Sequence, residues 1–133
     1  ELGPDCLTRL QGMFAFAIWD QRRRRLFLAR DRLGKKPLVY RAEPGRLLFA
    51  SEIKSLLQVP GLPRALDPIA LDEYLTYGYV PHPRTMFAGI RKLPPAHYAV
   101  YEHGTLTVRS YWSPDLQGTC ELPLDELLAG MKW

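Results

Sequence analysis

Short apolar stretches, separated by residues that favour turns, constrain the fold of this chain most strongly. They are residues 13–19, 26–29, 37–41 and 46–50. Stretches of this length, bounded by Gly, Pro and charged residues, are typical of β-strands, whereas a buried helix needs about ten residues or more. The spacing predicts four antiparallel strands that pair in sequence order.

The first stretch, residues 13–19, is apolar at every position. That pattern is typical of a strand that is covered on both faces. Because side chains alternate between the two faces of a strand, the residues divide into two sets. One set is Phe14, Phe16 and Ile18, and the other is Ala15, Ala17 and Trp19.

Two glycine-containing turns define the expected hairpins. Pro44 fixes its own φ near −65° and Gly45 accepts a positive φ, which is the chemistry of a type II turn. His103 and Gly104 separate residues 97–101 from residues 105–111. Glycine at this position predicts a tight turn and a closing hairpin.

Two helix starts follow the strands. Ser51 can cap a helix in which Glu52 occupies the first turn and Ile53, Leu56 and Leu57 are apolar. Asp67 and Pro68 form a second start signal, and Gly78 ends that helix. Its predicted buried stripe is Ile69, Leu71, Tyr74 and Leu75. Strands and short helices together predict an α+β fold with antiparallel sheets.

Three motifs in a fixed order carry a family resemblance. They are the segment RLQGMFAFAIWD, the pattern Arg30-Asp31-x-x-Gly34-x-x-Pro37, and Ala50-Ser51-Glu52. Together they resemble the second half of the glutaminase domain of class II glutamine amidotransferases. Residues 66–112 narrow the likeness to glutamine-hydrolysing asparagine synthetases.

The resemblance implies an α/β/β/α sandwich of the N-terminal-nucleophile kind, incomplete in this fragment. Residues 1–112 would be the C-terminal part of the glutamine amidotransferase domain, and residues 113–133 the truncated start of a synthetase domain. The parent would hydrolyse glutamine with an N-terminal cysteine, an activated nucleophile. It would then amidate aspartate with ATP and Mg²⁺. Glutamine, aspartate, ATP and the missing halves of the chain would be its partners, with a homodimer as one option.

No catalytic residue is assigned within the chain, because the nucleophilic cysteine is expected upstream of Glu1. The fragment alone is therefore expected to be inactive and to need no cofactor. The motif residues are expected near the glutaminase pocket or the domain interface: Arg30, Asp31, Gly34, Pro37, Ser51 and Glu52. For Arg30 and Asp31, the favoured interpretation is that they fix the loop before Gly34. Residues that bind glutamine remain unassigned.

Other candidate sites are weaker. Gly34-Lys35-Lys36 lacks the phosphate-loop pattern, and Pro37 removes an N–H donor. His82, His97 and His103 lack metal-ligand spacing, so no metal site is expected. Cys6 is interpreted as a small buried core thiol rather than a nucleophile.

Composition limits the remaining alternatives. The 133 residues carry a net charge of +4, and no apolar run approaches the ~20 residues that cross a bilayer. Two cysteines, Cys6 and Cys120, without paired spacing favour a reduced, cytoplasmic setting. The run from Arg22 to Arg25 keeps open a nucleic-acid-binding module, although charge in a hairpin turn also keeps that turn in water. Another class II amidotransferase acting on a different carboxylate also stays open.

Both ends look cut. Leu124, Leu127, Leu128 and Met131 begin an apolar helical stripe near the last residue. At the other end, the strand at residues 13–19 lacks upstream neighbours. An unpaired edge and an uncovered apolar face favour aggregation, so we expect the isolated chain to be oligomeric or poorly soluble.

Overall fold

A computed structural model describes residues 3–114 and residue 126 of the chain. The predicted stripe at Leu124, Leu127, Leu128 and Met131 lies outside the described residues, as does Cys120. Within the described part, no helix has the length and apolar character needed to cross a membrane.

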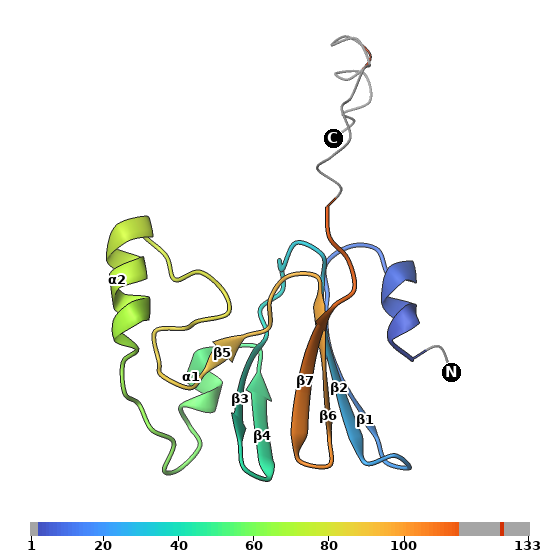
Figure 1. Ribbon diagram of the computed structural model, residues 1–133, viewed down its shortest axis with the longest axis horizontal. Helices are drawn as coiled ribbons and strands as arrows, with labels where there is room; N and C mark the ends of the chain where they lie inside the picture. The colour runs from blue at the N-terminus through green and yellow to red at the C-terminus, as the bar shows by residue number, and fades with distance from the viewer. Residues whose placement is uncertain (1–2, 115–125, 127–133) are drawn as a thin grey trace.

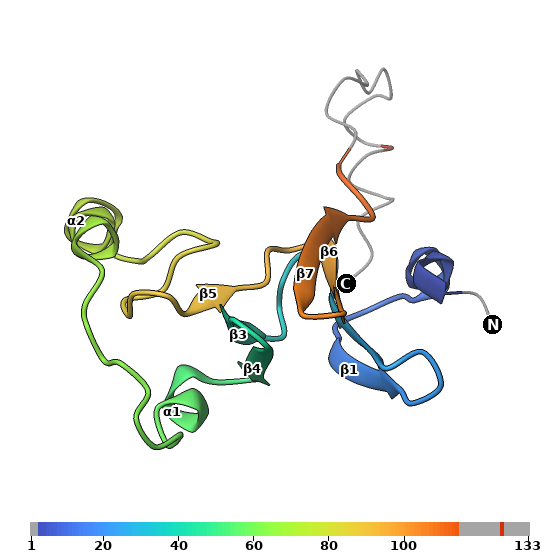
Figure 2. The same ribbon diagram turned by 60° about the horizontal axis from the view of Figure 1, so that its bottom comes forward.

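Two antiparallel sheets stacked face to face form the body of the protein (Figures 1 and 2). The larger sheet has the strand order β1-β2-β6-β7, and the smaller has the order β4-β3-β5. The strands of the larger sheet are β1 (Ala15–Asp20), β2 (Arg25–Arg30), β6 (His97–Glu102) and β7 (Thr105–Ser110). Those of the smaller sheet are β3 (Val39–Glu43), β4 (Arg46–Ala50) and β5 (Arg91–Lys92).

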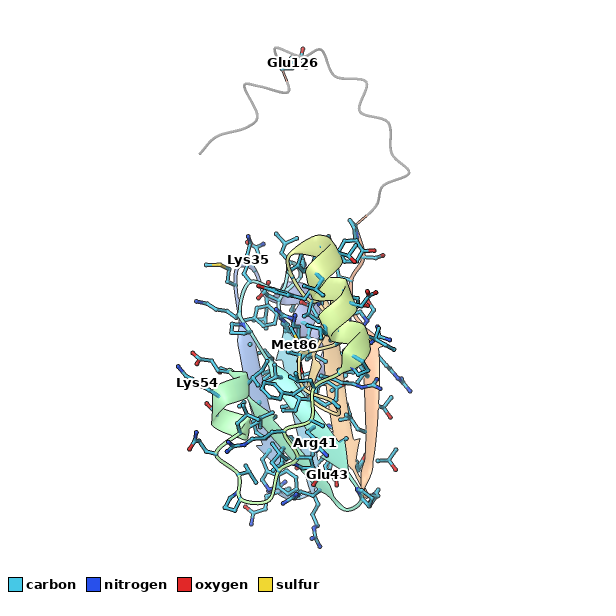
Figure 3. All side chains as sticks on the ribbon, turned by 90° about the vertical axis from the view of Figure 1, so that its left-hand side faces the viewer. Lys35, Arg41, Glu43, Lys54, Met86 and Glu126 are labelled. Carbon is cyan, nitrogen blue, oxygen red and sulfur yellow. The ribbon has the colours of Figure 1, made fainter. Side chains whose placement is uncertain are left out.

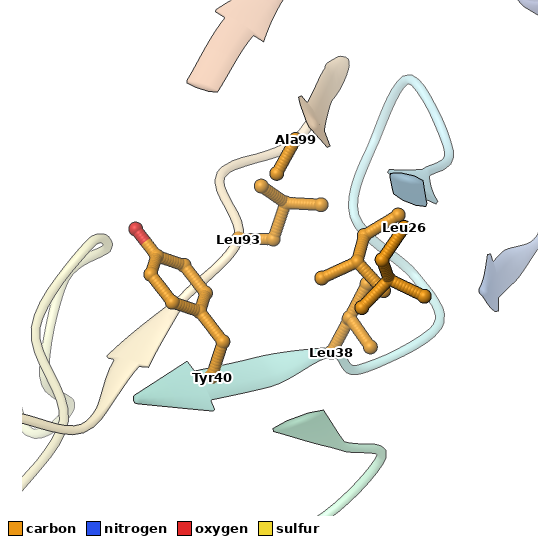
Figure 4. Close-up of a cluster of buried hydrophobic side chains, with 6 residues drawn as sticks. Leu26, Leu38, Tyr40, Leu93 and Ala99 are labelled. Atoms are coloured by element: carbon orange, nitrogen blue, oxygen red, sulfur yellow. The ribbon is translucent and has the colours of Figure 1, made fainter. Parts of the chain in front are cut away.

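The main core fills the space between the two sheets (Figure 4). Leu26 and Leu28 of β2 and Ala99 of β6 meet Tyr40 of β3. Leu38 and Leu93, which adjoin β3 and β5, complete the cluster. Full burial of one leucine side chain contributes about 2 kcal/mol, so this cluster is a principal source of stability.

Short helices lie at the outer faces of the sandwich. Helix α1 (Ile53–Leu56) packs its Leu56 against Val39 and Ile90 on the outer side of the smaller sheet. The 3₁₀-helix η1 (Gly3–Arg9) buries Leu7 and, with Ile18 and Phe27, lines a hollow on the outer face of the larger sheet. The predicted fold class, α+β with stacked antiparallel sheets, is confirmed.

The predicted pairing of four strands in sequence order is correct for β1 with β2 and for β3 with β4, but wrong for β2 with β3. β2 pairs with β6 instead, and β3 pairs with β5 on its other side, so β2 and β3 belong to different sheets. The segment between β2 and β3 crosses from one sheet to the other. β3 also begins at Val39 rather than at Pro37, because Pro37 has no N–H to donate to a ladder.

The first strand is less covered than its sequence predicted. β1 lies at the edge of its sheet, with 54% of Ile18 and 56% of Trp19 exposed. Only β2 flanks it among the described residues, and η1 covers part of one face. The predicted division of its side chains is correct. Ala15 packs on the inner core, whereas the Phe16 ring lies 6.0 Å from the Phe27 ring, centre to centre, away from that core.

The hairpin turns agree with their sequences. Gly45 has φ of 71°, as its predicted turn requires. His103 and Gly104 have φ of 49° and 78°, the two positive values of a type I′ turn, so the closing hairpin between β6 and β7 is confirmed.

Helix α2 (Pro68–Tyr77) begins and ends where predicted. The Asp67 carboxylate accepts hydrogen bonds from the N–H groups of Ile69 (3.0 Å) and Ala70 (3.3 Å), and Gly78 closes the helix with φ of 76°. The predicted buried stripe is wrong. Ala70 is the buried residue of α2, and Leu75 is 76% exposed. The reason is visible in Figures 1 and 2, where α2 stands apart from both sheets.

Candidate functional site

Arg30, the last residue of β2, holds the loop that carries the Arg30-to-Pro37 motif. Its guanidinium donates from Nε to the Lys36 carbonyl (2.8 Å) and from Nη2 to the Gly34 carbonyl (2.5 Å). Nη1 reaches across to the Leu93 carbonyl next to β5 (2.6 Å). Burial lowers the pKa of Arg30, and the negative charge of Asp31 partly offsets that effect. Arg30 therefore joins the two sheets as well as the two ends of the loop.

Asp31 is the buried centre of the same loop, with 2% of its surface exposed. Its Oδ1 accepts from the N–H groups of Leu33 (3.1 Å) and Lys35 (3.0 Å), and its Oδ2 from that of Lys36 (2.9 Å). Burial alone raises the pKa of Asp31, but these backbone N–H groups together lower it below its ordinary value. Asp31 thus stays ionised as a structural acceptor.

Gly34 is required by the close approach of its neighbours. Its φ is 64°, and an added Cβ would lie 2.8 Å from Cγ of Pro95 and 3.1 Å from Cζ of Arg30. Any side chain here would be strained by conformation and would also displace the guanidinium. The Arg30-to-Pro37 motif therefore combines a cationic anchor, a buried acceptor and a glycine into one rigid loop.

A cavity of about 440 Å³ brings the Arg30-to-Pro37 motif and the Ala50-Ser51-Glu52 motif together. Arg30 and Pro37 contribute from the loop, and Ser51 and Glu52 from the start of α1. The register explains this meeting, because Val39 of β3 pairs with Ala50, the residue before Ser51. We call this cavity the motif cavity.

A second hollow, of about 490 Å³, shares two of its lining residues with the motif cavity. Pro37 and Ser51 line both, and Met13, Phe14, Ala15 and Lys36 complete the second. All three sequence motifs therefore border adjoining hollows, although RLQGMFAFAIWD lies far from Ser51 in the chain.

The Ala50-Ser51-Glu52 motif does not act as predicted at the start of α1. Glu52, not Ser51, occupies the N-cap position, and no side chain caps the helix. The Glu52 carboxylate instead pairs with Nζ of Lys54 at 2.6 Å, and Lys54 projects from α1 in Figure 3. Since Ser51 forms no hydrogen bond with the described residues through its hydroxyl, that hydroxyl remains available to the cavity.

Lys92 is a lining residue that the sequence interpretation missed. It pairs with Val39 in the ladder between β3 and β5, and its Nζ donates to the Val80 carbonyl at 2.5 Å. Burial lowers the pKa of Lys92, the positive charge of Arg30 lowers it further, and Glu73 raises it. A single lysine within a segment rich in Pro and Gly gave no periodic signal that could have marked it.

The other candidates lie away from the motif cavity. Cys6 is a free thiol that is partly exposed rather than buried, because η1 covers only the rim of the hollow that it lines. Arg22, Arg23 and Arg24 are exposed in the turn between β1 and β2, where the N–H of Arg23 donates to Asp20 (3.0 Å). In the described part, no three His, Cys, Asp or Glu residues are grouped to hold a metal ion.

Comparisons with known proteins give a consistent result. A family model described as a glutamine amidotransferase domain matches residues 1–112. Asparagine synthetase (glutamine-hydrolyzing) 3 of Bacillus subtilis is 42% identical over 114 residues, which are 85% of this chain and 19% of the relative. A putative asparagine synthetase (glutamine-hydrolyzing) of Mycobacterium tuberculosis strain H37Rv is 43% identical over 100 residues, 73% of this chain and 15% of the relative.

A relative with another printed name also matches. Amidase chyE of Penicillium rubens is 37% identical over 98 residues, which are 74% of this chain and 14% of the relative. The chain spans about a fifth or less of the length of these three curated relatives. The family match covers all three motifs and the two stacked sheets, and the chain therefore belongs to the glutamine amidotransferase domain family, in the form found in glutamine-hydrolysing asparagine synthetases.

Proposed function

We propose that this chain is the C-terminal part of the glutaminase domain of a glutamine-dependent asparagine synthetase. The observation that carries the proposal is the family match over residues 1–112, which contains the Arg30 to Pro37 loop and the Ser51-Glu52 pair around one cavity. The printed names of the Bacillus and Mycobacterium relatives support the same assignment. Residues 113–133 would begin the following synthetase domain.

The proposed reaction has two parts. Water cleaves the side-chain amide of glutamine and gives glutamate and ammonia. In a separate site, ATP and Mg²⁺ activate the aspartate side-chain carboxylate, and ammonia displaces the activating group to give asparagine. The nucleophilic cysteine and the ATP site would be supplied by other parts of the enzyme. A cytoplasmic location belongs to the proposal and agrees with Cys6 being free among the described residues, and a homodimer is one option for the assembled enzyme.

The role of the described residues in this reaction is to support the glutaminase domain. Arg30, Asp31 and Gly34 are bonded to or packed against the backbone of their own loop, so they are positioning residues. Pro37, Ser51 and Glu52 form the wall of the motif cavity, at the glutaminase pocket or at the interface with the next domain.

The proposal is tested with the enzyme that contains this chain, supplied with glutamine labelled with ¹⁵N in the amide group, aspartate, ATP and Mg²⁺. Asparagine labelled in its side-chain amide is expected. The matched variant Asp31→Ala should lower synthesis from glutamine while leaving synthesis from added ammonium near the unmodified level, because Asp31 supports only the glutaminase side. Release of glutamate without labelled asparagine would refute the assignment of aspartate as acceptor.

Glutamate release without labelled asparagine would favour another class II amidotransferase that acts on a different carboxylate. The similarity to a Penicillium relative named an amidase supports that alternative. Repeating the assay with other carboxylic acids as acceptors distinguishes it from an asparagine synthetase. Absence of both glutamate release and amide transfer would refute the family-based function altogether.

A further inference from the structure

The motif cavity carries more positive charge than its acidic lining balances. Arg30, Lys92 and Lys54 are its cations, and Glu52 is the acidic residue that lines it within the described part. Glu52 is already paired with Lys54 at 2.6 Å. Arg30 and Lys92 therefore face the cavity without an acidic partner in its wall.

The other nearby carboxylates do not line the motif cavity. Asp31 accepts three backbone N–H groups of its own loop. Glu73 of α2 binds the Arg84 guanidinium through Oε1 at 3.1 Å, and its buried Oε2 has no hydrogen bond to the described residues. Burial and mutual repulsion accordingly lower the pKa of Lys92 despite the presence of Glu73. An anion in the cavity would relieve this cost.

The residues that line the motif cavity still have N–H and O–H groups that can donate hydrogen bonds to such an anion. Arg30 gives three N–H groups to carbonyls, and a guanidinium has five. Lys92 gives one to the Val80 carbonyl, and an ammonium has three. The Ser51 hydroxyl has no hydrogen bond to the residues that the structure describes. Two cations and one neutral donor thus converge from the loop, from β5 and from the residue after β4.

The register brings these donors to the same end of the smaller sheet. Val39, the first residue of β3, pairs with Ala50 of β4 and with Lys92 of β5, and Ser51 follows Ala50, so Ser51 and Lys92 both lie beside the start of β3. Arg30 is held beside them because its Nη1 bonds the carbonyl of Leu93, the residue after Lys92. The arrangement is fixed by backbone pairing rather than by flexible surface chains.

We propose that the motif cavity binds a small carboxylate anion from solution, with Arg30 and Lys92 as charged donors and Ser51 as a neutral donor. A guanidinium matches the two oxygens of a carboxylate. The volume of about 440 Å³ falls within the size of small-molecule sites. Glu52 at the same wall would repel a dianion, so a singly charged carboxylate fits better than phosphate. The site stands independently of the proposed asparagine synthetase activity.

The test is an NMR titration of the protein with sodium acetate at constant ionic strength, with sodium chloride as the balancing salt. Acetate should produce saturable shifts at the Arg30 Nε–H and at the backbone amides of Ser51 and Lys92. Acetate should also raise the pKa of the Lys92 ammonium. Shifts no larger than those with chloride would overturn the proposal, and so would tighter binding of phosphate than of acetate.

Variants assign the shifts to the named donors. Lys92→Met should weaken acetate binding about tenfold or more, the usual worth of a charged hydrogen bond. Lys92→Arg should retain binding. Lys35→Met removes the same charge from an exposed side chain of the neighbouring loop and should leave affinity unchanged.

Should Lys92→Met fail to fold, Ser51→Ala decides the question, because Ser51 is exposed and its hydroxyl has no hydrogen bond to the described residues. Weaker acetate binding in Ser51→Ala supports the site. Unchanged binding in Ser51→Ala, or equal weakening in Lys35→Met, would show that acetate does not occupy the motif cavity.

Discussion

Replacement of Asp31 by alanine should destabilise the protein more than any other single change in the loop from Arg30 to Pro37. The carboxylate accepts three backbone N–H groups, at 2.9, 3.0 and 3.1 Å, and is 2% exposed. An unsatisfied buried donor costs about 1 kcal/mol or more. With three donors left behind, we expect Asp31→Ala to lower the free energy of unfolding by about 3 kcal/mol.

The variant Asp31→Asn distinguishes the contributions of the two carboxylate oxygens of Asp31. Its side-chain oxygen can still accept from Leu33 and Lys35, but its amide group meets the N–H of Lys36 donor to donor. Asp31→Asn should therefore lower the free energy of unfolding, but by less than Asp31→Ala does. Asp72→Ala on the exposed surface of α2 is the matched control and should change stability by about 0.5 kcal/mol or less.

The assay is urea unfolding followed by tryptophan fluorescence, at one low protein concentration for all variants. An Asp31→Ala loss of less than about 1 kcal/mol, no larger than that of one ordinary hydrogen bond, would refute the role of Asp31 as the loop's central acceptor.

The same residue predicts how stability depends on pH. Its folded pKa is lowered, whereas an unfolded aspartate titrates near 3.9, so the folded state binds this proton more weakly. The contribution of Asp31 is therefore fully present above about pH 5 and is lost as pH falls below about 4 through the folded pKa. The stability difference between the unmodified protein and Asp31→Asn should shrink over that acid range. A difference that stays constant down to pH 2 would contradict the assignment.

Three further predictions concern the glycine, the edge strand and α2. Gly34→Ala should lower stability more than Gly45→Ala in urea unfolding, because both have positive φ but only Gly34 would press a Cβ on other atoms; equal losses would contradict this. Ile18→Lys should reduce self-association measured by sedimentation, because charge blocks an exposed edge strand; a monodisperse unmodified monomer would contradict the premise. Asp67→Ala should weaken hydrogen-exchange protection in α2 by about 1 kcal/mol, whereas Leu75→Glu, on an exposed side chain, should not; the reverse order would refute the observed packing of α2.

The sequence predicts local structure well where backbone chemistry decides it. Asp67, Pro68 and Gly78 mark the two ends of α2, and the turn at His103 and Gly104 closes its hairpin, because caps and positive φ depend on a few adjacent residues. The strand β4 occupies residues 46–50 as predicted for the same reason.

Pairing and burial were predicted less well because they depend on distant partners. The local pattern could not show that β2 would pair with β6, about seventy residues later, rather than with β3. The apolar stripe of α2 has the period of a buried helix, but in the described residues nothing packs over Leu75. Periodicity reports which face can be buried and not what lies against it.

In the candidate site, too, local motifs were predicted well and contacts between distant residues were not. The motif order identified Arg30, Asp31, Gly34, Pro37, Ser51 and Glu52, and all six either brace the loop or line the motif cavity. The favoured interpretation of Arg30 and Asp31 as loop-fixing residues agrees with their hydrogen bonds, although each binds backbone rather than the other. Lys92 joins the site only through the ladder between β3 and β5, which no local signal reveals.

The stacking of two separate sheets positions the loop, the motif cavity and the core, and methyl NMR tests it most directly. Nuclear Overhauser contacts are expected between Leu28 of β2 and Leu93 beside β5, which share the core between the sheets. Backbone contacts are expected between β2 and β6 and not between β2 and β3. Contacts between β2 and β3 in one continuous sheet, with none between Leu28 and Leu93, would contradict the layered fold and the sites built on it.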